Sequence, residues 1–239
     1  MKLAQNILLV AFTLLLATSI AAQKRGWSET GNTTEEDRKV GDFKSVSVGG
    51  GIDLEITQGN SNTLHVIASD HAIDNLITEV KGDQLRIYFD KKVRRVKKSL
   101  VQITVDDLES IHASGGSDVE GKGVLKFDEL RIDGSGGSDM ELELEVEKLY
   151  VNCSGGSDIE IEGSTKYLDL NASGGSDFDG YDFEAKEVVI SASGGSDSNV
   201  YASESITVNA SGSSDVNFKG NPSKTKLRSS GSSDIHSHK

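Results

Sequence analysis

The stretch SGGSD, in which Asp is the only ionisable residue, occurs five times in this chain and returns twice as SGSSD. A catalytic motif is needed once per site, so seven copies indicate a structural turn, a multivalent surface, or both. A degenerate copy lies upstream, where VSVGGGIDL aligns with IHASGGSDV. The pattern therefore predicts that eight carboxylates stack as a ladder along the repeats: Asp53, Asp118, Asp139, Asp158, Asp177, Asp197, Asp215 and Asp234.

The chemistry of such a ladder depends on the distance between its carboxylates. On stacked β-coils, neighbouring carboxylates lie about 4.8 Å apart and repel by about 1 kcal/mol per pair in water. Turn N–H groups, Ser hydroxyls or bound cations could relieve this repulsion. Calcium-binding repeats of the GGxGxD type use similar residues, but on a period of nine. We therefore expect hydrogen bonds to relieve the repulsion and depress the Asp pKa values, with no metal or other cofactor.

A second charged feature is the run KKVRRVKK, which lies between two predicted strands, QLRIYFD and LVQITVD. It is strongly basic, although the chain as a whole carries a net charge of −13. A projecting loop or hairpin of this kind is either simply solvated or a contact for anionic polymers such as lipid A phosphates or acidic glycans. The candidate contact residues are Lys91, Lys92, Arg94, Arg95, Lys97 and Lys98.

Charge and motif content argue against two classes of function. The acidic balance disfavours nucleic acid as a partner, because phosphate repulsion opposes binding. The chain contains no GxSxG, HExxH or P-loop motif. Polysaccharide lyases on β-helices need Asp, Arg and Lys together in a cleft, and no repeated column here mixes those residue types. We therefore expect that the protein is not an enzyme.

The elements that position these residues follow from the repeat period. The motif Asp residues are 18–21 positions apart, which is typical of one coil of a β-solenoid. The Gly pair would allow positive φ at a corner, with Ser and Asp capping it. In the preceding stretch LYVNC, alternation turns Leu149, Val151 and Cys153 inward. The residues equivalent to Cys153 are Gly or Ala in the other copies, so Cys153 is expected to be a small buried side chain.

The N-terminal segments are predicted to lie outside the solenoid. Residues 1–22 carry an early Lys, an apolar run and small residues, which is the pattern of a secretory signal peptide. Residues 23–39 are polar and acidic and are expected to be a flexible linker. The solenoid is expected to occupy residues 40–239, with no segment apolar enough to cross a membrane. The predicted location is periplasmic, cell-surface or extracellular.

Three stretches taken in order resemble one known family. RKVGDFKSVSVGGGIDLEITQG, then VQITVDDLESIHASGGSDV, then serial SGGSD coils are similar to the putative auto-transporter adhesin, head GIN domain family. The resemblance runs from Arg38 to Asp234. It implies an exported bacterial protein, an all-β fold that is a right-handed parallel β-helix of the pectate-lyase type, and a role in cell adhesion. It implies no catalytic residues.

Three functions remain open at this point. The first is an exported, non-enzymatic β-solenoid that mediates adhesion, with cell-surface glycans or envelope components as partners. The second is a carbohydrate-active enzyme on the same scaffold. The third is a periplasmic protein that senses the envelope or binds a ligand. The sequence does not indicate an oligomeric state.

Overall fold

A computed structural model describes residues 32–238 of the chain. The predicted signal peptide and most of the predicted linker lie outside the described residues. Part of that linker segment, however, forms strand β1 (Thr33–Asp37), which pairs antiparallel with β4. Its side chains are all exposed, so composition alone favoured a linker. The strand forms because its backbone satisfies the free edge of β4.

The N-terminal half of the described chain contains short strands and one 3₁₀ turn. Its elements are β2 (Ser45–Gly49), β3 (Asp53–Gln58), β4 (Thr63–Ser69), η1 (Ile73–Asn75), β5 (Leu76–Lys81), β6 (Gln84–Phe89), β7 (Ser99–Val105), β8 (Ser110–Ser114) and β9 (Asp118–Gly121). The antiparallel pairs β4–β7 and β5–β6 lie at one end of the stack. They cover the end of the core that the first coils would otherwise expose.

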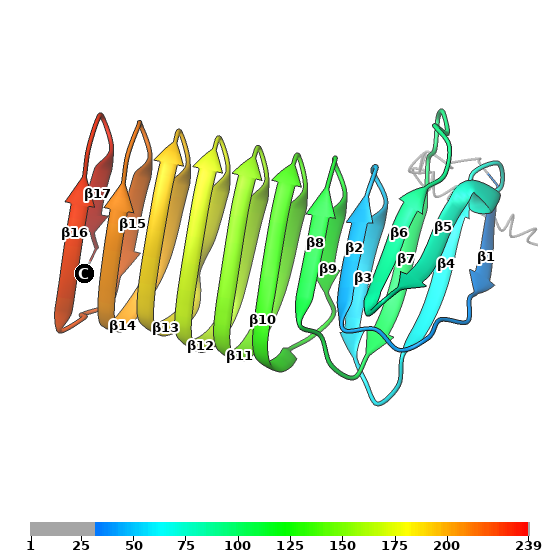
Figure 1. The fold of residues 1–239 in the computed structure, drawn as a ribbon, viewed down its shortest axis with the longest axis horizontal. Helices are drawn as coiled ribbons and strands as arrows, with labels where there is room; N and C mark the ends of the chain where they lie inside the picture. Colours follow the sequence, from blue (N-terminus) through cyan, green and yellow to red (C-terminus); the bar gives the residue numbers. More distant parts are fainter. Residues whose placement is uncertain (1–31, 239) are drawn as a thin grey trace, which may run out of the picture. The chain divides into compact units, whose positions relative to one another are not determined.

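The repeat region contains longer strands that run from one motif to the next. Its elements are β10 (Leu125–Gly136), β11 (Asp139–Gly155), β12 (Asp158–Gly174), β13 (Asp177–Gly194), β14 (Asp197–Ala210), β15 (Asp215–Lys219), β16 (Lys224–Ser229) and β17 (Asp234–Ser237). Their coils stack in parallel, as Figure 1 shows. The predicted all-β solenoid is confirmed, and its right-handedness stays a prediction.

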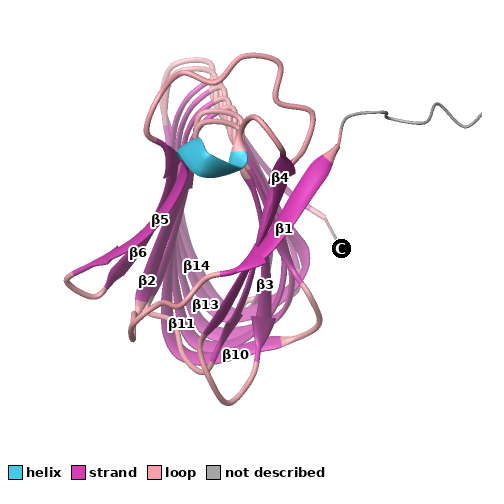
Figure 2. Ribbon diagram, turned by 90° about the vertical axis from the view of Figure 1, so that its right-hand side faces the viewer, coloured by secondary structure: helices cyan, strands magenta, loops and turns pink. Residues whose placement is uncertain are grey.

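Each coil contributes to two layers that face each other across the core (Figure 2). The layer that follows each motif Asp is called here the carboxylate sheet; it contains β7, β3, β9, the first parts of β11–β14, β15 and β17. The layer that precedes each motif is called the mixed sheet; it contains β6, β2, β8, β10, the later parts of β11–β14 and β16. The strands bend from one layer to the other at one edge, and the motifs form tight corners at the other.

The inward columns hold the coils in register. Gly134, Cys153, Ala172, Ala192 and Ala210 are directly paired from coil to coil, as the alternation predicted. Only 1% of Cys153 is exposed, and burial raises the pKa of its thiol to about 12, with smaller contributions from nearby carboxylates. The thiol is therefore an inert packing group.

The first coils do not follow chain order. β2 lies between β6 and β8, and β3 lies between β7 and β9. The coil made by β6 and β7 therefore precedes the coil made by β2 and β3 in the stack. This arrangement places residues 90–98, which join β6 to β7, at the corner of the first coil.

Candidate functional site

The tight corner is built on the first Gly of each motif. Gly155 has a φ of 79°, and Gly174 has a φ of 82°. A Cβ on Gly174 would also lie 2.9 Å from the carbonyl oxygen of Gly155 in the preceding coil. Only Gly fits this position, because both the backbone conformation and the inter-coil contact exclude a side chain.

The second Gly of the motif is under a weaker constraint. Gly156 and Gly175 do not have positive φ, and a Cβ there would approach no atom closer than 3.5 Å. The sequence predicted that both glycines of the pair would allow positive φ. In these coils, only the first Gly adopts the left-handed conformation. This difference explains why the last two motifs read SGSSD, with Ser213 and Ser232 at the second position.

In five of the seven motifs, the Ser directly before the Asp caps the corner from inside. Ser157 is completely buried, and its Oγ accepts a hydrogen bond from the N–H of Ser154 at 3.2 Å. Ser233 both accepts from the N–H of Ser230 and donates to its carbonyl oxygen. The sequence had assigned capping to Ser and Asp together. The structure gives it to the Ser hydroxyl alone among the described side chains.

The motif carboxylates form the predicted ladder. Asp118 pairs with Asp139, Asp139 with Asp158, and the register continues to Asp234. Asp53 lies beside Asp118 because Leu54 pairs with Val119. The ladder is therefore a continuous column on the outside of the carboxylate sheet.

The expected relief of repulsion by turn N–H groups is wrong. The N–H of Gly156 donates to the carbonyl of Gly136, and the N–H of Asp158 donates to the carbonyl of Ser138. These N–H groups already donate to backbone carbonyls of the preceding coil, so they are not free to bind the carboxylates. Partial burial, followed by the neighbouring Asp residues, raises the pKa of Asp158 and of Asp197. A depressed pKa was expected, so the sign is reversed at these positions.

A second column of carboxylates runs beside the first, and the sequence analysis missed it. Glu120, Glu141, Glu160 and Asp179 are directly paired from coil to coil, two residues after each motif Asp. The recurring Asp-x-Glu pattern in the sequence could have revealed it, since alternation places both residues on one face. Together the two columns border a shallow hollow of about 470 Å³.

The acidic character of this surface changes along the stack. The second column continues as Asn199 and Asn217, whose side-chain amides are hydrogen bonded at 3.0 Å. At the other end, Lys98 lies near Asp53 and Glu55. Burial and Asp118 raise the pKa of Asp53, while Lys98 lowers it. Within residues 32–238, no three Asp, Glu, His or Cys side chains are grouped closely enough to suggest a metal site.

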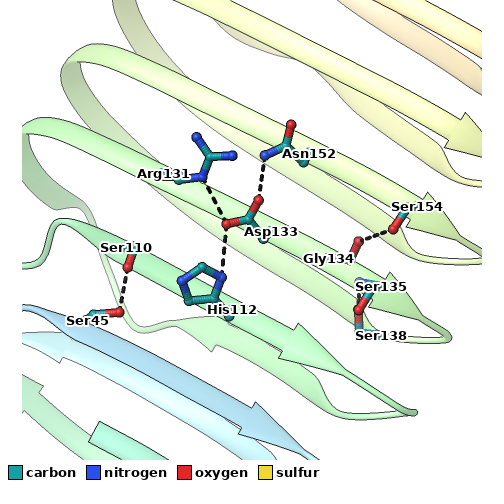
Figure 3. Close-up of polar contacts among 10 residues, drawn as sticks. All are labelled: Ser45, Ser110, His112, Arg131, Asp133, Gly134, Ser135, Ser138, Asn152 and Ser154. Carbon is teal, nitrogen blue, oxygen red and sulfur yellow. Dashed lines mark hydrogen bonds and ion pairs between the residues drawn. The ribbon is translucent and has the colours of Figure 1, made fainter. Parts of the chain in front are cut away.

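The outside of the mixed sheet is organised differently. Figure 3 shows Asp133 as the centre of a small network on β10 and its neighbours. Its Oδ2 lies 2.9 Å from Nδ1 of His112 and accepts from Nε of Arg131 at 3.1 Å. Its Oδ1 accepts from the side-chain amide of Asn152. One carboxylate is thus shared by three donors from three successive coils.

Neutral side chains extend this surface along the stack. Asn152 is followed in register by Asn171, Ser191 and Asn209. Tyr150 and Tyr167 meet edge to face beside this column, with ring centroids 6.1 Å apart. Amides that can both donate and accept, next to two partly exposed rings, are suited to hydroxyl-rich ligands.

The bend opposite the motifs carries a larger groove of about 1180 Å³. Its charges pair with each other across coils. Lys126 binds Glu145 at 2.6 Å, and Lys166 binds Glu147. These ion pairs engage the lysines of the groove, whereas carboxylates such as Asp128 and Glu184 form no ion pair with the described residues.

The predicted basic residues lie together on the segment that joins β6 to β7, which projects from the first coil in Figure 1. It is a crossover between the two sheets, because β6 belongs to the mixed sheet and β7 to the carboxylate sheet. The hairpin alternative is therefore wrong. Five of the six basic side chains are exposed, and Lys98 is half-buried.

Comparison with known proteins assigns the chain to a family. The model for the family described as putative auto-transporter adhesin, head GIN domain, matches residues 42–222. The chain belongs to this family. No curated protein matches it. The family match begins after β1 and ends before β16, so the head GIN domain covers most of the stack but omits the last coil.

Three solved structures share the fold. A putative adhesin from Bacteroides fragilis NCTC 9343 has 27% identity and a TM-score of 0.79, covering 87% of this chain and 97% of that one. A putative adhesin from Parabacteroides merdae ATCC 43184 has 19% identity and a TM-score of 0.71, covering 88% and 98%. A putative lipid binding protein from Parabacteroides distasonis ATCC 8503 has 20% identity and a TM-score of 0.70, covering 88% and 98%. The family and its adhesin-like neighbours support adhesion or binding at the cell surface.

Among the described residues, no helix is long and apolar enough to cross a membrane.

Proposed function

We propose that this head GIN domain protein is an exported, non-enzymatic adhesin that binds neutral surface glycans through its mixed sheet. The observation that carries the proposal is the column Asn152, Asn171, Ser191 and Asn209, which repeats hydrogen-bonding groups at the coil spacing beside Tyr150 and Tyr167. A glycan chain repeats its hydroxyls along its length, so a ladder of amides can contact several sugars at once.

The charge of the carboxylate sheet also supports a neutral glycan as the ligand, because it disfavours acidic glycans. Its two acidic columns would repel sulfated or carboxylated glycans, whereas the mixed sheet shares its acidic Asp133 among three donors. Charge therefore favours a neutral chain on the mixed sheet.

The test is binding of the full chain to immobilised neutral and acidic glycans. Tyr150→Ala combined with Asn171→Ala should weaken binding to neutral glycans by roughly thirtyfold, since each of the two contacts contributes about 1 kcal/mol. Glu141→Gln combined with Glu160→Gln is the matched control, because it alters two exposed residues of the other sheet. Equal binding of neutral glycans by both double variants would show that the mixed sheet is not the glycan-binding site.

Two further measurements separate the alternative functions. A reducing-end assay on pectin, alginate and mucin glycans tests for a carbohydrate-active enzyme, and we expect no turnover. Turnover that a single Asp→Asn substitution abolishes would establish an enzyme instead. Protease shaving of intact cells should degrade a surface adhesin, and protection of the protein would favour a periplasmic sensing or ligand-binding role.

A further inference from the structure

We propose that the basic loop, defined as residues 91–98, docks the protein onto the phosphate groups of an anionic lipid surface. This site lies on the first coil and shares no residue with the proposed glycan surface of the mixed sheet. The two proposals can therefore fail independently.

The loop differs from the other corners in length and composition. In the coil formed by β11 and β12, only Gly156 and Ser157 separate the two strands. At the corner of the first coil, the chain takes the nine residues between Phe89 and Ser99. A corner can be closed with two residues in this fold, so the longer basic segment is not required to join the sheets.

The charges of the loop form no salt bridge within residues 32–238, although Lys98 lies near Asp53 and Glu55. None of its six Lys and Arg side chains forms an ion pair with a carboxylate of the described residues, although lysines on the bend are paired across coils. An excess of unpaired positive charge at one place in a strongly acidic chain is an electrostatic docking surface for anions.

The backbone of the loop is held in place. Ser69 Oγ accepts hydrogen bonds from the N–H groups of Lys97 and Lys98, both at 3.3 Å. His71 Nε2 lies 3.1 Å from the carbonyl oxygen of Arg94. Arg95 has a φ of 57°, the only positive φ of a non-glycine residue in the described chain. Anchors on both sides therefore hold a strained turn that presents its basic side chains outward.

The residue types favour a lipid surface over an acidic glycan. Four of the six basic residues are lysines, which act as point charges, and the loop contains no aromatic or amide side chain with which to recognise a sugar. Its two other residues, Val93 and Val96, are partly exposed and interrupt the basic run at regular spacing. Apolar residues among Lys and Arg fit the boundary between lipid headgroups and acyl chains.

The rest of the molecule fixes how it would sit on such a surface. The acidic columns run along the carboxylate sheet away from the loop and would be repelled by anionic lipid. The first coil would therefore face the lipid, with the repeats pointing away from it. This orientation leaves the mixed sheet free to bind a second surface.

The first experiment is co-sedimentation of the full chain with vesicles of phosphatidylcholine, with or without phosphatidylglycerol. The predicted signal peptide contains an apolar run that can bind both kinds of vesicle, so the difference between them isolates electrostatic docking. A triple variant of the loop is compared with a triple variant of the exposed strand β16, which removes the same charge at the other end of the stack. The two variants are K91Q/K92Q/R94Q and K224Q/K226Q/R228Q.

We expect preferential binding to phosphatidylglycerol vesicles that falls with added salt. The loop variant should lose this preference by roughly a hundredfold, because each of the three basic residues near an anionic surface contributes a factor of about five. The β16 variant should keep it. No preference in the native chain, or an equal loss in both variants, would overturn the proposal. Binding to an acidic polysaccharide without binding to the vesicles would overturn it in favour of a glycan.

The second experiment reads the contact directly. Val93→Cys introduces one thiol at a partly exposed position and Thr225→Cys one at an exposed position, whereas Cys153 is too buried to react with a polarity-sensitive fluorophore. On phosphatidylglycerol vesicles, the label at position 93 should shift its emission to the blue, while the label at position 225 should not. A shift at both positions, or at neither, would contradict docking through the loop.

Discussion

The two sheets of the solenoid have the same inside and opposite outsides. Both pack alternating apolar side chains into one core, as Ile159 does in the carboxylate sheet and Val151 in the mixed sheet. Outside, the carboxylate sheet stacks like charges, whereas the mixed sheet shares Asp133 among His112, Arg131 and Asn152. The core and the corners therefore determine register, and the outer columns are free to vary for binding.

The largest effect is expected at the corner that both sheets share. Gly174→Ala should destabilise the fold by about 2 kcal/mol or more, because it forces a side chain into the left-handed region and against Gly155. Gly175→Ala is the matched control and should change stability by less than about 0.5 kcal/mol. Denaturant unfolding compares the two variants. Similar losses would show that the corner does not discriminate between its glycines.

The buried cap should come next in size. Ser157→Ala removes the acceptor for the N–H of Ser154 and should lower the free energy of unfolding by about 1–3 kcal/mol. Ser198→Ala should be neutral or stabilising, because the Oγ of Ser198 is buried without a hydrogen-bond partner among the described residues. A loss at Ser198 equal to the loss at Ser157 would mean that burial, and not capping, determines the cost.

The difference between the two outer surfaces predicts substitutions of opposite sign. Asp133→Ala should destabilise the protein by about 1 kcal/mol at neutral pH, since three donors lose their shared acceptor. Asp158→Asn should stabilise it by up to about 1 kcal/mol, since repulsion by Asp139 and Asp177 is removed. Thermal melts of the two variants at low salt measure both effects. A change in stability of the same sign for both substitutions would contradict the proposed difference between the outer surfaces of the two sheets.

The smallest expected effect is the pH dependence of that stabilisation. The folded-state pKa of Asp158 is raised, so the native protein binds its proton more tightly than the unfolded chain does. The contribution of this residue to stability therefore increases as the pH falls through the folded-state pKa toward the unfolded value. The advantage of Asp158→Asn at pH 7 should disappear by about pH 3, where both side chains are neutral.

A control separates this effect from general acid sensitivity. Asp42→Asn is the matched control, because it removes an exposed carboxylate that lies outside the ladder. Micromolar calcium should not raise the melting temperature of the native chain. A large rise would show that cations, rather than residual repulsion, determine the state of the carboxylates.

Much of the fold could be predicted because it is periodic. The spacing of the motif Asp residues and the alternation around Cys153 were sufficient to place the coils and the inward column. The order of the first coils was not predictable in this way, because β2 pairs with β6 and β8 through contacts distant in sequence. Strand β1 was missed because its exposed, acidic residues form a strand only against β4.

The candidate site was predicted less completely. The ladder from Asp118 to Asp234 followed from the repeat, but the sign of its pKa shifts did not. Sequence shows that N–H donors exist at a turn, and it does not show that the preceding coil already uses them. The column containing Glu141 and Glu160 is visible in the sequence as Asp-x-Glu, because alternation places both residues on one face of a strand.

The parallel stacking of the coils also has a mechanical consequence. The hydrogen bonds between coils lie along the stack, so tension applied between β1 and β17 would open one ladder at a time instead of shearing many together. Each released coil would free roughly 6 nm of extended chain. An adhesin built in this way would lengthen stepwise under load, while the coils that remain folded stay bound to the ligand.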